Sequence, residues 1–242
     1  MSRMRIVLLM LVVSIATSAV ATGSASAFKW EQCRLARVMG GGQWENRQCT
    51  KGPGSKEFET RGLRKGEEEA AEPIEGTGGE AKLESEIGST KITIACKKTT
   101  FTGNLELEGK SNATIKYTEC KLVETSTGKE VTNCTVEPIT AVVVDELIEN
   151  AGALEDKFLQ KEGKPFAELT ITGASCGFKI TKQAVTGTQT CELPHGEEFL
   201  EVHEIVCKAS GSALKFGSKA ATYIGNVRVW KLDRRDWRGQ KQ

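Results

Sequence analysis

Apolar and polar residues alternate with a period of two in short runs along much of the chain. In residues 167–172, Ala167, Leu169 and Ile171 alternate with one glutamate and two threonines. This period is typical of a strand that buries one of its faces. A comparable run over residues 221–229 lies near the C-terminal end. The pattern therefore predicts β-strands.

Short runs of this kind, separated by turn residues, recur from residue 83 to residue 232. Their regular spacing predicts an all-β domain over 83–232, built as an antiparallel sandwich or barrel. The apolar stretch that ends at Val144 predicts a strand buried on both faces. Residues 158–171 predict a hairpin that turns at Gly163. Residues 145–158 also fit a helical stripe, so a short helix there is an alternative.

Residues 1–27 have the composition of a secretory signal peptide. Two arginines precede an apolar run over residues 6–15, and small residues lead to Ala25-Ser26-Ala27. This A-x-A sequence is typical of a cleavage site. A retained membrane anchor is the alternative, but the apolar run is short for a bilayer span. We therefore expect a secreted, extracellular protein that has no membrane span after signal removal.

The charge of the chain is nearly balanced. The 33 Lys and Arg residues against 32 Asp and Glu give +1, and loss of Arg3 and Arg5 with the signal peptide makes the mature chain −1. Such a chain gives no indication of a nucleic-acid partner. Its length is enough to bury a core, so disulfides would reinforce the fold rather than replace that core.

The cysteine count predicts a disulfide framework. All eight cysteines follow the predicted cleavage site, and this even number behind an export signal implies up to four structural disulfides. A zinc site would need close pairs, whereas the nearest two cysteines are fourteen positions apart. We expect no metal and no cofactor. The structural cysteines are Cys33, Cys49, Cys96, Cys120, Cys134, Cys176, Cys191 and Cys207.

Residues 28–50 predict a small N-terminal hairpin with a glycine turn, closed by a disulfide between Cys33 and Cys49. A loop of that size contributes about 3 kcal/mol in the chain-entropy model. Trp30 and Trp44 are expected to pack beside this bridge; a stacking platform for a sugar or aromatic ligand is the less common alternative.

Two further segments lack the strand pattern. Residues 51–82 are rich in glycine and charge and contain a single aromatic residue, so a flexible charged linker is predicted there. Residues 233–242 form a basic tail that could contact an anionic cell-wall polymer, although such ends are more often simply solvated.

Several strings resemble a group of exported, cysteine-containing, β-rich proteins of soil actinobacteria. The strings are Thr186-Gly-Thr-Gln-Thr-Cys191, His203-Glu-Ile-Val-Cys207, residues 210–217, Ile92-Thr-Ile-Ala-Cys96 and the tryptophan–cysteine hairpin. The likeness covers most of the mature chain apart from the linker. It implies export and a β-rich fold, and it carries over no catalytic residue.

The resemblance also favours a disulfide pairing among the 105 that eight cysteines allow. It implies the local bridges Cys33–Cys49, Cys120–Cys134 and Cys191–Cys207. Cys96 and Cys176 would then join the first and the middle strands.

One serine and two histidines are candidates for chemistry. Gly173-Ala-Ser175-Cys-Gly177 matches the G-x-S-x-G elbow of serine hydrolases, but a strand pattern follows Ser175 where the elbow needs a helix. His195 and His203, with neighbouring glutamates, would suit zinc or copper. On one strand they would lie roughly 26 Å apart, so a solvated outer face or a hairpin tip is favoured instead.

These observations predict an exported, non-enzymatic β-domain with an interaction or structural role at or outside the cell surface. Its partner could be a cell-envelope polymer or a protein. An extracellular hydrolase or a carbohydrate-binding module is the alternative.

Overall fold

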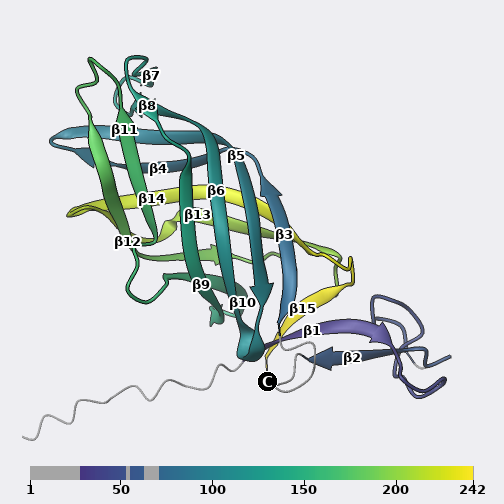
Figure 1. Cartoon of the computed structure of the whole chain (residues 1–242). Helices are drawn as coiled ribbons and strands as arrows, with labels where there is room; N and C mark the ends of the chain where they lie inside the picture. The colour runs from purple at the N-terminus through teal and green to yellow at the C-terminus, as the bar shows by residue number, and fades with distance from the viewer. Residues whose placement is uncertain (1–27, 53–54, 63–70, 242) are drawn as a thin grey trace, which may run out of the picture.

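The computed structural model describes residues 28–52, 55–62 and 71–241. The predicted signal peptide lies outside these residues. Strands make up 67% of the structure and helix 1%, so the predicted all-β class with disulfides is confirmed. The strands form two antiparallel sheets, a large one and a three-stranded one (Figure 1).

The large sheet closes on itself. β5 pairs with β3 and β4, and both of these pair with β14. The sheet continues from β14 to β13 and β12, and β12 pairs with β10 and β11. These two pair with β9, β9 pairs with β6, and β6 pairs again with β5. Between the predicted sandwich and barrel, the pairing therefore gives the barrel. The strands are β3 (Glu72–Gly78), β4 (Ala81–Ile87), β5 (Thr90–Leu105), β6 (Lys110–Glu124), β7 (Lys129–Glu130), β8 (Thr135–Val136), β9 (Ile139–Asn150), β10 (Ala153–Gln160), β11 (Ala167–Thr172), β12 (Ile180–Glu192), β13 (Val202–Phe216) and β14 (Lys219–Lys231).

Alternation places apolar side chains inside the barrel. Ala167, Leu169 and Ile171 of β11 are buried, as are Val227 and Val229 of β14. Successive side chains of a strand point to opposite faces, so each such run covers the interior with every second residue. The two runs that the sequence predicts as strands are therefore confirmed.

The region around β9 corrects two predictions. β9 buries Ala141 and Val143 but leaves Val142 and Val144 only half-buried, so it is not buried on both faces. Residues 145–158 contain no helix; β9 continues to Asn150, and β10 returns after a turn at Ala151 and Gly152. Leu147 and Leu154 fit a helical stripe and also face the barrel interior, so spacing alone could not separate the two.

β10 and β11 do not form the predicted hairpin. Both run antiparallel to β12, β10 beside residues 188–192 and β11 beside residues 180–185. β10 and β11 therefore lie one after the other along β12. β3 and β4 share β5 in the same way.

The small sheet covers one end of the barrel. It has the order β15-β1-β2, with β1 (Phe28–Leu35), β2 (Phe58–Gly62) and β15 (Trp237–Lys241), and lies at the lower right of Figure 1. Trp30 and Trp237 meet edge to face with ring centroids 5.2 Å apart. Trp30 also donates from Nε1 to the carbonyl of Lys110, beside the 3-10 turn η1 (Leu107–Gly109). The inner face of this sheet thus belongs to the barrel core.

This sheet corrects the predicted N-terminal and C-terminal segments. The N-terminal segment carries the predicted Cys33–Cys49 bridge, and the strand partners of β1 are β2 and β15 rather than residues 44–49. Residues 58–62 and 72–78 are strands, so the linker prediction fails there; residues 53–54 and 63–70 lie outside the described part. Residues 237–241 of the predicted tail are likewise a strand.

All eight cysteines form disulfides. The predicted Cys33–Cys49 and Cys191–Cys207 bridges are present. The other two predicted pairs are wrong, because Cys96 bonds to Cys120 and Cys134 bonds to Cys176. Cys96 and Cys120 occupy facing positions of β5 and β6, a juxtaposition that the sheet register creates.

Candidate anion-binding groove

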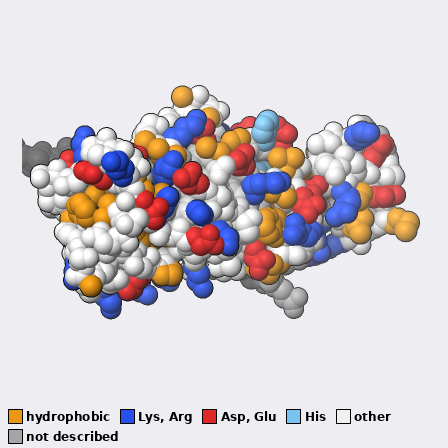
Figure 2. Space-filling model, turned by 90° about the horizontal axis from the view of Figure 1, so that it is seen from above, with side chains coloured by type: hydrophobic (Ala, Val, Ile, Leu, Met, Phe, Trp, Pro, Cys, Tyr) orange, Lys and Arg blue, Asp and Glu red, His pale blue; other side chains and the backbone are white. Residues whose placement is uncertain are grey.

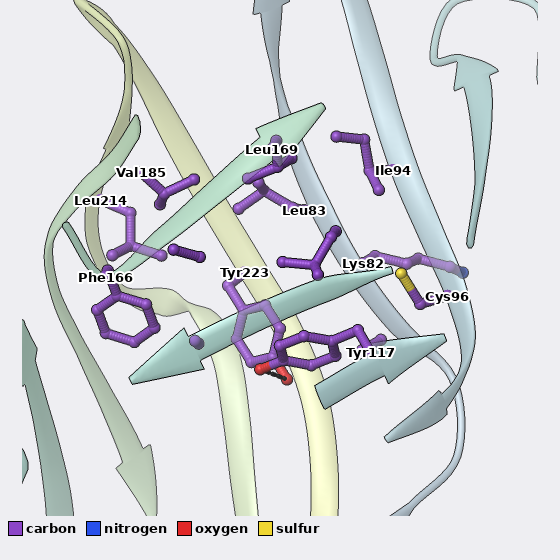
Figure 3. A pocket seen from close by; sticks show the side chains of 14 residues that line it. Lys82, Leu83, Ile94, Cys96, Tyr117, Phe166, Leu169, Val185, Leu214 and Tyr223 are labelled. Atoms are coloured by element: carbon purple, nitrogen blue, oxygen red, sulfur yellow. Dashed lines mark hydrogen bonds between the residues drawn. The ribbon is translucent and has the colours of Figure 1, made fainter. Parts of the chain in front are cut away.

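The barrel interior holds a narrow apolar cavity (Figure 3). Phe166, Val185 and Leu214 line one side, and the hydroxyls of Tyr117 and Tyr223 meet at 3.2 Å. Burial raises the pKa of both tyrosines, so both stay neutral hydroxyls. The cavity volume is only about 40 Å³. An engineered cavity of roughly 150 Å³ is needed to hold benzene, so this one is a packing gap and not a ligand site.

A larger hollow lies at the small sheet. It has a volume of about 630 Å³, within the range of about 300–1,000 Å³ of small-molecule sites. Five arginines and one aspartate contribute to its lining. We call it the arginine groove; it is lined by Cys33, Arg34, Leu35, Arg37, Arg47, Phe58, Arg61, Arg235 and Asp236.

Four segments bring the arginines together. Arg34 lies near the end of β1, Arg37 and Arg47 lie in the loop after it, Arg61 lies in β2, and Arg235 lies between β14 and β15. The groove therefore exists only when the small sheet has formed.

The loop between β1 and β2 is fixed at two points. The disulfide between Cys33 and Cys49 ties its far end to β1, two residues after Arg47. Gly42 passes so close to β2 that a Cβ atom would lie 2.3 Å from the carbonyl oxygen of Phe58. Only glycine permits that approach, so Gly42 serves the contact with β2.

Trp44 packs against this disulfide, but Trp30 does not. The small cluster contains Cys33, Cys49 and Phe199, with Trp44 and Phe58 beside it. Trp30 is 3% exposed and belongs to the barrel core, so the prediction that both tryptophans shield the bridge is wrong. Because Trp30 is buried, the two tryptophan rings do not form an exposed stacking platform together.

Three of the arginines have carboxylate partners. Arg34 lies 3.4 Å from Glu72, Arg61 lies 2.8 Å from Glu59, and Arg235 lies 3.2 Å from Asp233. These pairs hold the guanidinium groups in place at the groove wall. The side chains of Arg34 and Glu72 are only 9% and 11% exposed, so the fold fixes this pair, whereas the exposed Arg235–Asp233 pair contributes little to stability and mainly orients the arginine.

Arg37 and Arg47 differ from these three. Within the described residues, neither has a carboxylate at ion-pair distance, and both side chains are exposed. Each guanidinium presents a planar set of N–H donors that fits carboxylate or phosphate oxygens two at a time. They are the donors available to an incoming anion.

Asp236 supplies the acidic group of the groove. Burial raises the pKa of its carboxyl group, and the charge of Arg47 acts in the opposite direction. Arg47 therefore faces a carboxyl group that is harder to ionise than usual. Arg37 and Arg47 therefore carry the positive charge of the groove that ion pairs do not neutralise.

The G-x-S-x-G match at residues 173–177 does not form a serine elbow. Ser175 lies in an exposed turn beside the Cys134–Cys176 disulfide, and β12 follows it rather than a helix. Its carbonyl accepts a hydrogen bond of 2.7 Å from Asn133. This geometry does not raise Ser175 above a sheet as a nucleophile elbow requires.

The two histidines occupy different environments. His195 is exposed in a turn, with Nδ1 2.7 Å from Glu198. His203 is 1% exposed on β13, so the prediction of a solvated face is wrong for it. Its Nε2 donates to the carbonyl of Trp237 at 2.7 Å, and burial lowers its pKa to about 4. In the described part of the chain, no three His, Cys, Asp or Glu side chains form a metal-binding group.

No protein-family model, curated protein or solved structure matches this chain. Among the described residues, no helix is long and apolar enough to cross a membrane.

Sequence reasoning missed most of the groove. Arg235 belongs to the predicted basic tail, but Arg34, Arg37 and Arg47 stand singly between other residue types. Only the pairing of β1 with β2 and β15 gathers them. An arginine count over residues 34–61 would have been the one available signal.

Proposed function

We propose that this chain is an exported, non-enzymatic β-domain that binds an anionic component of the cell envelope at or outside the cell surface. The arginine groove carries this proposal. Its size suits a ligand or a polymer segment, and within the described residues neither Arg37 nor Arg47 has a carboxylate at ion-pair distance, although the charge of Arg47 acts on Asp236. Four disulfides support an oxidising compartment.

The class of ligand follows from the donors. Arginine clusters favour oxyanions that accept two parallel hydrogen bonds, and phosphate and carboxylate groups have this geometry. A neutral sugar would not neutralise the positive charges of the groove. The proposed ligand is therefore a phosphate- or carboxylate-bearing molecule.

Binding of labelled polyphosphate to the refolded, disulfide-bonded chain 28–242 tests the proposal. Fluorescence anisotropy should show binding that weakens as salt is added, because added ions screen exposed charges. The double variant Arg37→Gln/Arg47→Gln should bind at least about tenfold more weakly, since each lost charged hydrogen bond contributes about 1.5–3 kcal/mol.

Lys161→Gln/Lys164→Gln is the matched control. It removes the same charge from an exposed turn between β10 and β11. Equal weakening in both double variants, or no binding by the native chain, would contradict the arginine groove as the site.

A further inference from the structure

The loop beside the arginine groove exposes an unusual set of apolar side chains. Among the described residues, the exposed large hydrophobic side chains are Leu35, Val38, Met39, Ile224 and Leu232. Three of them fall within residues 35–39, and Met39 is 98% exposed. Single exposed apolar residues are common on protein surfaces, but a cluster at one loop marks an interaction surface.

Backbone hydrogen bonds hold this loop as a tight turn. The amide of Gly41 donates to the carbonyl of Val38 at 2.8 Å, and Gly40 between them has a φ of +75°. A positive φ at this position is typical of a type II turn, which places Met39 at the tip. At the base of the turn, the amide of Ala36 donates to Glu57 at 2.7 Å. The apolar tip is therefore displayed on a fixed support.

Positive charge surrounds this apolar tip. Residues 34–61 contain six Lys and Arg against three Glu, a balance of +3, while the mature chain as a whole is −1. The remainder of the mature chain is accordingly −4. Figure 2 shows basic side chains at the end of the molecule on the right, with an apolar side chain protruding at its extremity.

We propose that this end of the molecule docks on a bilayer of anionic phospholipid, with the Val38–Met39 tip among the upper acyl chains and the arginines of the groove on headgroup phosphates. This inference rests on the proposed function and names its ligand as a lipid surface.

A bilayer matches both parts of the surface. Phosphate groups and hydrocarbon lie within a few ångströms of each other at a membrane interface, and apolar insertion combines there with electrostatic attraction. A soluble polyanion would engage the arginines and leave Leu35, Val38 and Met39 in water. The acidic remainder of the chain is repelled by an anionic leaflet, which orients the basic end towards it.

Vesicle co-sedimentation of the refolded chain 28–242 tests this inference. The chain should bind vesicles that contain phosphatidylglycerol and should bind pure phosphatidylcholine vesicles much more weakly. Arg37→Gln/Arg47→Gln should lower partitioning about 25-fold, since each basic residue near the surface contributes about a factor of five. Met39→Asp should lower it about tenfold or more, because a charged side chain replaces the apolar one that would be buried among the acyl chains on binding.

Ile224→Asp is the matched control. It places the same charge at an exposed apolar position on β14 of the barrel, away from residues 34–61 in the sequence, and should leave partitioning unchanged. Circular dichroism of each variant checks that the fold is intact.

The outcomes separate the two proposals. Polyphosphate binding without vesicle binding overturns the lipid inference and keeps the anionic-ligand function, while loss of both overturns both. Vesicle binding that is insensitive to Met39→Asp, or equal on both lipid compositions, overturns the combined apolar and electrostatic contact.

Discussion

The barrel and the small sheet are stabilised in different ways. The strands of the barrel circuit pair on both sides, and three of the four disulfides lie in this sheet or its loops. On the outer edge of β2 the described residues form a single bridge, between Phe58 and Trp44, and the small sheet has only a minor cluster of its own around Cys33, Cys49 and Phe199. Its inner side chains Trp30 and Trp237 pack in the barrel core.

This difference shows that the small sheet is not an independent domain. A three-stranded sheet needs a hydrophobic face packed on something, and here the barrel end provides it. The candidate binding surface therefore lies on the part of the molecule that depends on the other for stability. Separating the two parts should remove binding before it unfolds the barrel.

The junction also contains a buried ionic cluster. Lys231 is 1% exposed, lies 3.0 Å from Glu72 and also contacts Gln32 of β1. Gln32 donates to Glu72 at 3.0 Å. Since removal of one partner would leave a buried charge unpaired, this cluster fixes how β1 sits against β3 and β14.

Trp237→Ala should have the largest effect on the comparison. The side chain is 2% exposed and packs against Trp30 and His203, so its loss should cost about 3–5 kcal/mol. Urea unfolding followed by hydrogen exchange should show early opening of β1 amides and loss of polyphosphate binding. Trp230→Ala, a half-buried ring on β14, is the control; equal loss in both would disprove the special role of the junction.

Acid should weaken the junction through His203. Its pKa falls from 6.5 to about 4 on burial, so the neutral ring stabilises the fold above about pH 6.5, and this contribution is lost as pH falls towards 4. The shift corresponds to about 3 kcal/mol. His203→Gln keeps a donor for the Trp237 carbonyl and removes the titration, so urea midpoints of this variant should depend less on pH between about 7 and 4.5. An unchanged pH dependence would contradict the assignment.

A carboxyl pair inside the barrel should respond to pH in the opposite direction. Asp145 and Asp156, on β9 and β10, are buried within hydrogen-bonding reach of each other, and Ser111 donates to Asp145. Burial raises the pKa of both carboxyl groups, and for Asp156 the charge of Asp145 adds to it. Their contribution is therefore present below the unfolded pKa and is lost as pH rises through the folded values.

Asp156→Asn should stabilise the barrel slightly at alkaline pH. The amide donates to Asp145 without needing a proton, so the variant should gain roughly 1 kcal/mol at about pH 8 and little near pH 4. Urea midpoints at the two pH values measure this gain. A variant that loses stability at both pH values would contradict the proposed effect of the pair.

Local pattern predicted much of the barrel but not its connections. Alternation of apolar and polar residues at 167–171 and 221–229 is a property of each strand alone, so the sequence predicts both strands. The pairing of Cys96 with Cys120 depends on the register between β5 and β6, which no local signal encodes. The strand over residues 72–78 has few apolar residues and forms because β5 and β14 lie on either side of it.

The candidate site could not be read from the sequence for the same reason. Arg47 and Arg235 are separated by most of the chain, and nothing in their neighbours links them. The disulfide between Cys33 and Cys49 was predictable from its isolation, yet the strand partners of β1 were not. The groove forms only when β1 pairs with β2 and with β15, which is distant from it in the sequence.

The neighbouring positions of β1 and β15 have a consequence for biogenesis. Synthesis delivers Phe28 long before Lys241, yet the two residues face each other in the finished sheet. Contacts between segments so distant along the chain form slowly, so β1 can pair with β15 only late in folding. Ligand binding at this end would then require residues 237–241, and a chain truncated before them would not bind.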